Sequence, residues 1–283
     1  MAEWYLFLPQ VRVPVADIVE RARHAEASGF SGIAFIDHLE APGLPDEKIW
    51  EAMSVATWVA AKTERIRIGH LVLCDAFRHP AVLAKQAVTL SEASDGRFDL
   101  GLGSGSWPAE LARFDVGQQD PITRVKQLER DLDLMNQYWG RGEGGVGGQS
   151  PLPTHRIPLV LGGTGRRMME LVRRHADWWN IPANHIDRLA GLAPAAGSAR
   201  VSIQQMVGFV RKDSDPDEVR QVSAKRFGVL GSGLVCGDAD ELSGHFSHLS
   251  GQGVERFYVW FADFAAPESL HEFGETVIKA FPG

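Results

Sequence analysis

The sequence alternates between short apolar runs and segments with the 3.6-residue period of amphipathic helices, and this alternation continues almost to its end. Runs that are apolar at nearly every position are typical of strands buried on both faces, as in a parallel sheet. Helices between such strands supply the crossovers that a parallel sheet requires. The order of elements therefore predicts an α/β fold. The predicted strands are 4–9, 32–38, 65–73, 98–103, 158–163, 177–182, 200–210 and 256–263.

Eight strand–helix units in 283 residues favour a closed (β/α)8 barrel, the TIM barrel, over an open doubly wound sheet. The segment 140–153 interrupts the pattern near mid-chain, with six glycines in 14 residues. We expect this segment to be a flexible connection, either at a domain boundary or as a lid over an active site. Neither half alone would make a comfortable open sheet, so we predict one domain over 1–283.

Composition excludes several classes of function. The net charge of −7 gives no basic surface for nucleic acid, and no apolar run approaches the ~20 residues of a membrane span. The N-terminus, MAEWYLFLPQ, lacks the basic start of a signal peptide, so we expect a soluble cytoplasmic protein. The two cysteines lack metal-ligand spacing, and we predict no metal site. A homodimer is left open.

The active site of a TIM barrel lies where strands end and helices begin, and polar residues collect at these junctions here. The second predicted strand ends in Asp37 and His38, which could serve in catalysis or could be a helix cap beside a surface histidine. The fourth ends in GLGSGSW (101–107), followed by Glu110.

The GLGSGSW segment differs from the dinucleotide-binding fingerprint in two ways. Its sixth position is Ser106 instead of glycine, and it follows the fourth strand instead of the first. The small residues Ser104, Gly105 and Ser106 nevertheless suit close approach of a flat ligand to the backbone.

The segment PLVLGGTGRRMMELVRRHADWWN carries the strongest motif. Gly162, Gly163 and Gly165 allow a sharp turn with exposed N–H groups, and the helix that starts near Thr164 adds its positive end. Thr164 offers a hydroxyl, and Arg166 or its neighbour Arg167 adds charge. This pattern predicts a phosphate site. The alternative is a helix start that needs glycines only for packing.

Four segments together resemble the bacterial luciferase-like family of flavin and deazaflavin oxidoreductases. They occur in the family's order and cover most of the chain. The segments read AEASGFSGIAFIDHL, FRHPAVLAKQAVTLSEASDGRFDLGLGSGSWPAE, PLVLGGTGRRMMELVRRHADWWN and GQGVERFYVWF.

The resemblance implies a TIM barrel that binds FMN or the deazaflavin coenzyme F420, with the ring at the strand ends. It assigns the cofactor phosphate to residues 162–165, in agreement with the pattern described above. It also implies a non-proline cis peptide and a bulge in the third strand, behind the ring. By position, this peptide falls at Leu71–Val72.

Two departures from the family bear on the substrate. In its deazaflavin-dependent sugar-phosphate dehydrogenases an acidic residue follows the glycines of the fourth strand, where this chain has Ser106. An aromatic residue soon after the Asp–His pair is also missing, since 39–42 reads LEAP. Oxidation of glucose 6-phosphate is therefore not expected. His38 remains and suits proton transfer near neutral pH, so we predict His38 and Asp37 as catalytic.

The leading functional hypothesis is an oxidoreductase that transfers a hydride between coenzyme F420 and a small organic substrate. An FMN-dependent monooxygenase is the nearest alternative. The short chain favours F420, because a reduced flavin that reacts with oxygen needs a larger cover. A flavin- or deazaflavin-binding protein without catalysis is the alternative from another class. A metal-dependent hydrolase comes last.

Overall fold

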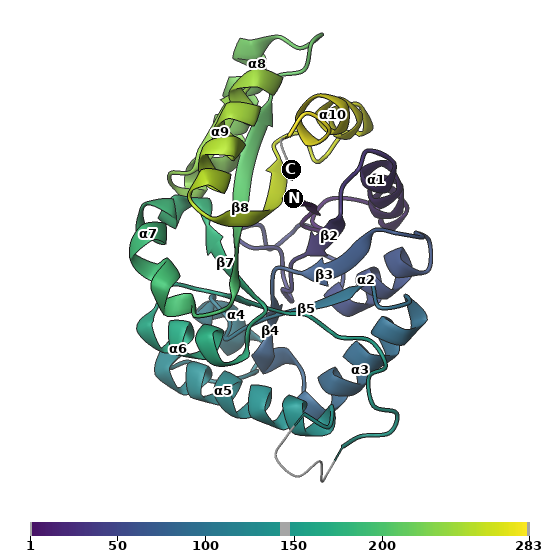
Figure 1. The fold of residues 1–283 in the computed structure, drawn as a ribbon, viewed down its shortest axis with the longest axis vertical. Coiled ribbons are helices and arrows are strands. Elements are labelled where there is room, and N and C mark those ends of the chain that lie inside the picture. Colours follow the sequence, from purple (N-terminus) through teal and green to yellow (C-terminus); the bar gives the residue numbers. More distant parts are fainter. Residues whose placement is uncertain (1, 142–147, 282–283) are drawn as a thin grey trace.

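The computed structural model describes residues 2–141 and 148–281. Their strands form one parallel sheet that closes on itself, because β10 (Val254–Phe261) pairs with both β1 (Glu3–Phe7) and β8 (Arg200–Phe209). Strands from before and after the 140–153 segment share this ring (Figure 1). The predicted TIM barrel is confirmed. The other strands are β2 (Gly32–Phe35), β3 (Arg67–His70), β4 (Leu73–Cys74), β5 (Phe98–Gly103), β6 (Leu159–Gly162), β7 (Trp178–Pro182) and β9 (Leu234–Gly237).

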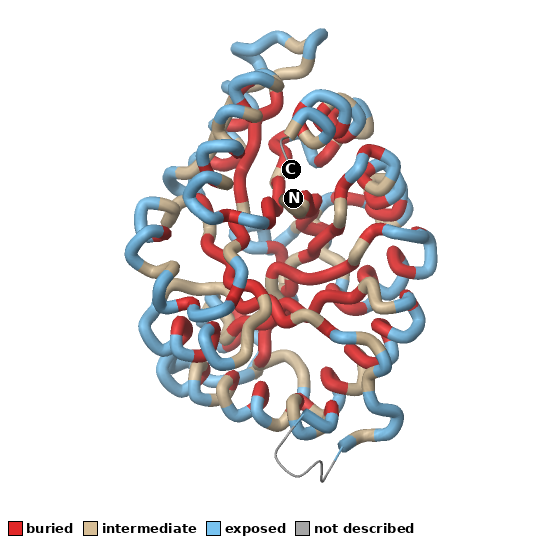
Figure 2. Tube along the Cα trace, in the orientation of Figure 1, coloured by how far each residue is buried: buried red, intermediate tan, exposed pale blue. Residues whose placement is uncertain are grey.

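Helices surround the ring in the order that the alternation predicts (Figure 1). Their inner faces and the strands hold the buried residues, while the outer faces are exposed (Figure 2). The helices are α1 (Val15–Ala27), α2 (Ala52–Ala60), α3 (Pro80–Ala93), α4 (Pro108–Arg113), α5 (Pro121–Tyr138), α6 (Arg166–His175), α7 (Leu189–Leu192), α8 (Pro216–Phe227), α9 (Ala239–Gly251) and α10 (Pro267–Phe273), with short turns η1 (Asp75–Phe77) and η2 (Ala183–Arg188).

The strand predicted at 65–73 is interrupted after His70 and continues as β4, at the place where the resemblance implied a bulge. Two other elements differ from the sequence-based expectation. The long helical stretch after β5 is two helices, since Pro108 and Pro121 each occupy a first helical position where the missing N–H costs nothing. The short strand β9 lies beside β8 and was not predicted. Residues 142–147 of the glycine-rich connection lie outside the described residues, so its flexibility and the single domain over 1–283 stay predictions.

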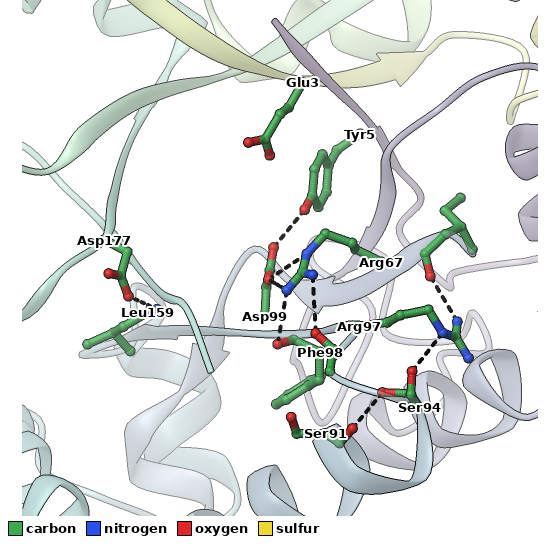
Figure 3. Close-up of polar contacts among 12 residues, drawn as sticks. Glu3, Tyr5, Arg67, Ser91, Ser94, Arg97, Phe98, Asp99, Leu159 and Asp177 are labelled. Atoms are coloured by element: carbon green, nitrogen blue, oxygen red, sulfur yellow. Dashed lines mark hydrogen bonds and ion pairs between the residues drawn. The ribbon is translucent and has the colours of Figure 1, made fainter. Parts of the chain in front are cut away.

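Charged residues fill the end of the barrel where the strands begin. The carboxylate of Asp99 accepts hydrogen bonds from the Tyr5 hydroxyl (2.7 Å), Arg67 Nε (3.0 Å) and Arg256 Nη1 (3.1 Å), and Arg256 also pairs with Glu3 (2.6 Å). Figure 3 shows Tyr5 and Arg67 converging on Asp99. Each charge has a partner, as burial requires. These paired side chains close the end of the barrel where the strands begin. A ligand site is therefore expected at the opposite end, where the strands finish.

Candidate functional site

His38 follows β2 at the carboxyl end of the barrel and contacts a buried carboxylate. Its Nδ1 lies 2.9 Å from Oε2 of Glu110, whose side chain is only 3% exposed. The other oxygen, Oε1, accepts the N–H groups of Leu39 (2.6 Å) and Glu40 (3.3 Å). A carboxylate with these donors is an acceptor, so Nδ1 of His38 carries the proton that it donates. The second ring nitrogen, Nε2, is then the atom that can accept a proton.

Glu110 is a site residue to which the sequence assigned no role. It lies in the first turn of α4, directly after the small-residue segment, and the ring of Trp107 stands edge-on to His38 with centroids 6.0 Å apart. The only signal in the sequence was its position just beyond a strand end. Contact with His38, 72 residues earlier, arises because the first turn of α4 lies against the loop that follows β2.

Asp37 was predicted together with His38, but its side chain makes different contacts. Its carboxylate forms a bidentate ion pair with Arg78, with N–O distances of 2.6 Å and 3.0 Å, and accepts a hydrogen bond from the Cys74 N–H at 2.8 Å. Arg78 also bonds Glu51, the N-cap of α2. These are the contacts of a residue that fixes the ends of neighbouring strands. A direct catalytic role for Asp37 stays a prediction that these contacts do not support.

The peptide bond between Leu71 and Val72 is cis, which confirms the feature that the resemblance implied. It falls between β3 and β4, where the strand bulges toward β5. A Cβ added at Gly103 would lie 2.7 Å from Cγ2 of Val72, and one at Gly101 would lie 1.8 Å from the His70 carbonyl oxygen. Gly101 is therefore required by the close approach of the His70 backbone, and Gly103 by the close approach of the Val72 side chain.

Ser104, Gly105 and Ser106 follow β5 at the same end of the barrel. Gly105 has a φ of +82°, and a Cβ there would lie 3.0 Å from Sγ of Cys74, so glycine is needed for both reasons. Burial raises the pKa of the Cys74 thiol to about 12, which keeps it protonated and unreactive. Contact of the three small residues with a flat ligand stays a prediction.

The glycine loop after β6 has the features of an anion site. Gly162 stands beside the cis peptide, since a Cβ there would lie 4.0 Å from Cγ1 of Val72. Gly163 has a φ of +122°, and its carbonyl oxygen accepts the indole N–H of Trp179 at 2.8 Å. Gly165 caps α6 without a side-chain hydrogen bond. The first N–H groups of α6 therefore have no side-chain acceptor of their own.

Thr164 in this loop is held by Arg188, a residue that the sequence did not indicate. Nη1 of Arg188 donates to the Thr164 hydroxyl oxygen at 2.7 Å, and Nη2 donates to its carbonyl oxygen at 3.2 Å. Because the hydroxyl oxygen accepts from arginine, its own proton points elsewhere. The structure thus brings a cation and a free O–H donor to the predicted phosphate loop.

Within residues 2–141 and 148–281, no three His, Cys, Asp or Glu side chains are grouped as metal ligands would be. In the same part of the chain, every helix is too short or too polar to cross a membrane.

Comparisons with known proteins agree with this architecture. The sequence profile described as "Luciferase-like monooxygenase" matches residues 6–208. An F420-dependent glucose-6-phosphate dehydrogenase of Kineococcus radiotolerans is 34% identical over 125 residues, which are 43% of this chain and 36% of that protein. The chain therefore spans well under half the length of this relative.

Solved structures share the fold at low sequence identity. An F420-dependent secondary alcohol dehydrogenase in complex with an F420–acetone adduct superposes with a TM-score of 0.80 at 17% identity, covering 100% of this chain and 99% of that one. The monooxygenase RslO1 from Streptomyces bottropensis has a TM-score of 0.79 at 15% identity, covering 99% of this chain and 100% of that one. With the profile match over most of its length, the chain belongs to the luciferase-like monooxygenase family.

Proposed function

We propose that this protein is a luciferase-like oxidoreductase that uses coenzyme F420 to transfer a hydride to or from a small organic substrate. The observation that carries the proposal is the His38–Glu110 pair at the carboxyl end of the barrel. The Kineococcus relative and the alcohol dehydrogenase of the same fold are both F420-dependent, which supports the choice of cofactor.

The residues present fit such a cofactor. Residues 162–165, together with Arg166, would hold its phosphate. Position 163 has a φ of +122° that favours glycine, and the first N–H groups of α6 have no side-chain cap and can donate to an anion. Arg188 would add charge, and because it donates to the Thr164 hydroxyl oxygen, the Thr164 O–H would be left to donate to the phosphate. Leu71 and Val72 would back the ring, with residues 104–106 along its other side.

The deazaflavin, when bound, supplies or accepts the hydride, and the protein is left to manage the proton. In oxidation of an alcohol to a carbonyl compound, the hydroxyl proton goes to Nε2 of His38. The carboxylate of Glu110 then stabilises the positive charge on the imidazole through Nδ1–H. Asp37 is paired with Arg78 and would help to position the chain next to His38.

This arrangement bears on the alternatives. A protein that only carried the cofactor would gain nothing from burying a carboxylate behind a partly exposed imidazole, so the pair favours catalysis. The FMN-dependent monooxygenase remains the nearest alternative, since RslO1 has the same fold. Glucose 6-phosphate is not proposed as the substrate, because Ser106 and the 39–42 segment depart from those dehydrogenases.

Titration of the purified protein with F420 and with FMN tests the proposal, with ligand fluorescence as the measurement. We expect micromolar or tighter binding of F420 and much weaker binding of FMN. Turnover is then measured by the absorbance change of F420 with a panel of small alcohols and carbonyl compounds. Tight FMN binding without measurable F420 binding would overturn the choice and favour the monooxygenase. F420 binding without turnover on any substrate would favour the carrier.

A further inference from the structure

A groove of about 400 Å³ runs between α5 and α6 on the outside of the barrel. It begins at the glycine loop, because α6 starts at Arg166, the residue directly after Gly165. Since α5 and α6 both start at the carboxyl end of the barrel, the upper part of the groove lies at the same end as the predicted phosphate site. The groove thus adjoins the glycine loop.

The groove is positively charged in a chain whose net charge is −7. Five cationic and two acidic side chains line it. At its lower end, Arg174 is neutralised by Glu129 and Asp133. The cations are Lys126, Arg166, Arg167, Arg173 and Arg174, and the acids are Glu129 and Glu170.

The cations at the upper end have no such neutralisation. Among the described residues, Lys126, Arg166 and Arg167 form no ion pair within 4 Å, and all three are exposed. They come from both walls, Lys126 from α5 and the two arginines from α6. A ligand with several negative charges could contact both walls at once, whereas a single phosphate at the loop could not.

We infer that the upper groove binds the acidic tail that follows the phosphate in F420, an inference that rests on the proposed function. The tail carries carboxylates along an extended chain, and FMN ends at its phosphate. The groove would therefore distinguish the two cofactors, although the loop that holds the phosphate treats them alike. Exposed ion pairs are individually weak and screened by salt, so the effect comes from several together.

Binding of two forms of the deazaflavin tests this subsite, one with an oligoglutamate tail and one that ends just after the phosphate. Fluorescence titrations at low and high salt give the dissociation constants. We expect the wild-type protein to bind the tailed form about tenfold more tightly at low salt, with the preference shrinking as salt is added. In Lys126→Gln/Arg167→Gln, most of this preference should be lost. Affinity for the tail-free form should fall much less than affinity for the tailed form, because Arg166 and the loop are intact.

The matched control is Lys62→Gln/Arg65→Gln, which removes two exposed cations at the turn between α2 and β3. It has the same change in net charge but lies at the other end of the barrel, so the preference should persist. Equal affinity of the wild type for both forms would overturn the subsite while leaving the proposed function intact. A preference that survives in Lys126→Gln/Arg167→Gln would overturn it equally. Failure of the wild type to bind either form would remove the proposed function and the subsite together.

Discussion

The imidazole of His38 and the carboxylate of Glu110 are 72 positions apart in sequence but only 2.9 Å apart from Nδ1 to Oε2. Two backbone N–H groups fix the carboxylate from the other side, so it cannot rotate away when the imidazole gains a proton. The pair is therefore built to hold one ring nitrogen in place and to leave the other available.

His38→Ala should lower turnover by about 100-fold or more while changing the F420 dissociation constant little, because the proton acceptor is lost and the phosphate loop is not. Steady-state kinetics on any substrate found in the panel and a binding titration check this. Wild-type turnover in the variant would make His38 an ordinary surface residue.

Glu110→Gln should reduce kcat by at least about tenfold with the cofactor affinity kept, because a neutral amide cannot stabilise a charged imidazole. Since Glu110 acts through His38, the double variant His38→Ala/Glu110→Gln should be no slower than His38→Ala alone. Glu268→Gln, an exposed carboxylate in the first turn of α10, is the control. Additive losses in the double variant would show that Glu110 acts independently of His38.

The sequence predicted the barrel and the places where its strands end, but not the pairing of side chains at those ends. Periodicity reports which face of an element is buried, and that suffices to order strands and helices. It carries no information on which carboxylate meets His38, which arginine holds Asp37, or that Arg188 reaches Thr164, since each contact depends on how loops pack after closure. The cis peptide at Leu71–Val72 came from the family resemblance, because nothing in the local residue types indicates it.

Short or interrupted strands were also not predicted from the residue pattern. The strand β9 has only four residues, LVCG, and three of them are half-buried, so neither alternation nor a long apolar run marks it. The residues alone did not show the interruption of the third strand, since RIRIGHLVL is apolar enough to be taken as one continuous strand, and only the family resemblance implied a bulge there.

Gly163→Val should weaken F420 binding by at least about tenfold, equivalent to ~1.4 kcal/mol, with the fold kept. The φ of +122° at Gly163 is closed to a β-branched residue, so the loop must change shape. The nearest side-chain atom to an added Cβ is Cγ of Met168 at 3.4 Å, so crowding is not the main effect. Gly191→Ala, where an added Cβ meets nothing within 4 Å, is the control. An unchanged dissociation constant with intact circular dichroism would remove Gly163 from the site.

Arg188→Gln should weaken binding of F420 but not of the deazaflavin nucleoside that lacks the phosphate. The guanidinium contributes charge and donates to the Thr164 hydroxyl oxygen, which leaves the Thr164 O–H to donate to a phosphate. Thr164→Val should show the same selectivity, and the two changes together should cost less than their sum because they share one contact. Equal losses for both ligands would mean that Arg188 supports the loop structurally and does not act on the phosphate.

A buried acid pair beside the site predicts how stability depends on pH. Asp75, in η1, is buried next to Asp131 of α5, and burial followed by repulsion from Asp131 raises the pKa of Asp75 from 3.8 to about 7. The folded state therefore binds a proton more tightly than the unfolded chain does. The stability contributed by that proton is complete below pH 3.8 and is lost as the pH rises to about 7.

Asp75→Asn removes this titration, since the amide stands in for the protonated acid and can still donate to Asp131. The variant should match the wild type near pH 4 and become progressively more stable than it up to about pH 8, by a few kcal/mol at ~1.4 kcal/mol per pKa unit. Thermal unfolding of both proteins across this range measures the difference, with Asp213→Asn at an exposed position as the control. A difference that does not change with pH would mean that Asp75 is ionised throughout, and a less stable variant at pH 8 would mean that its charge is used in the fold.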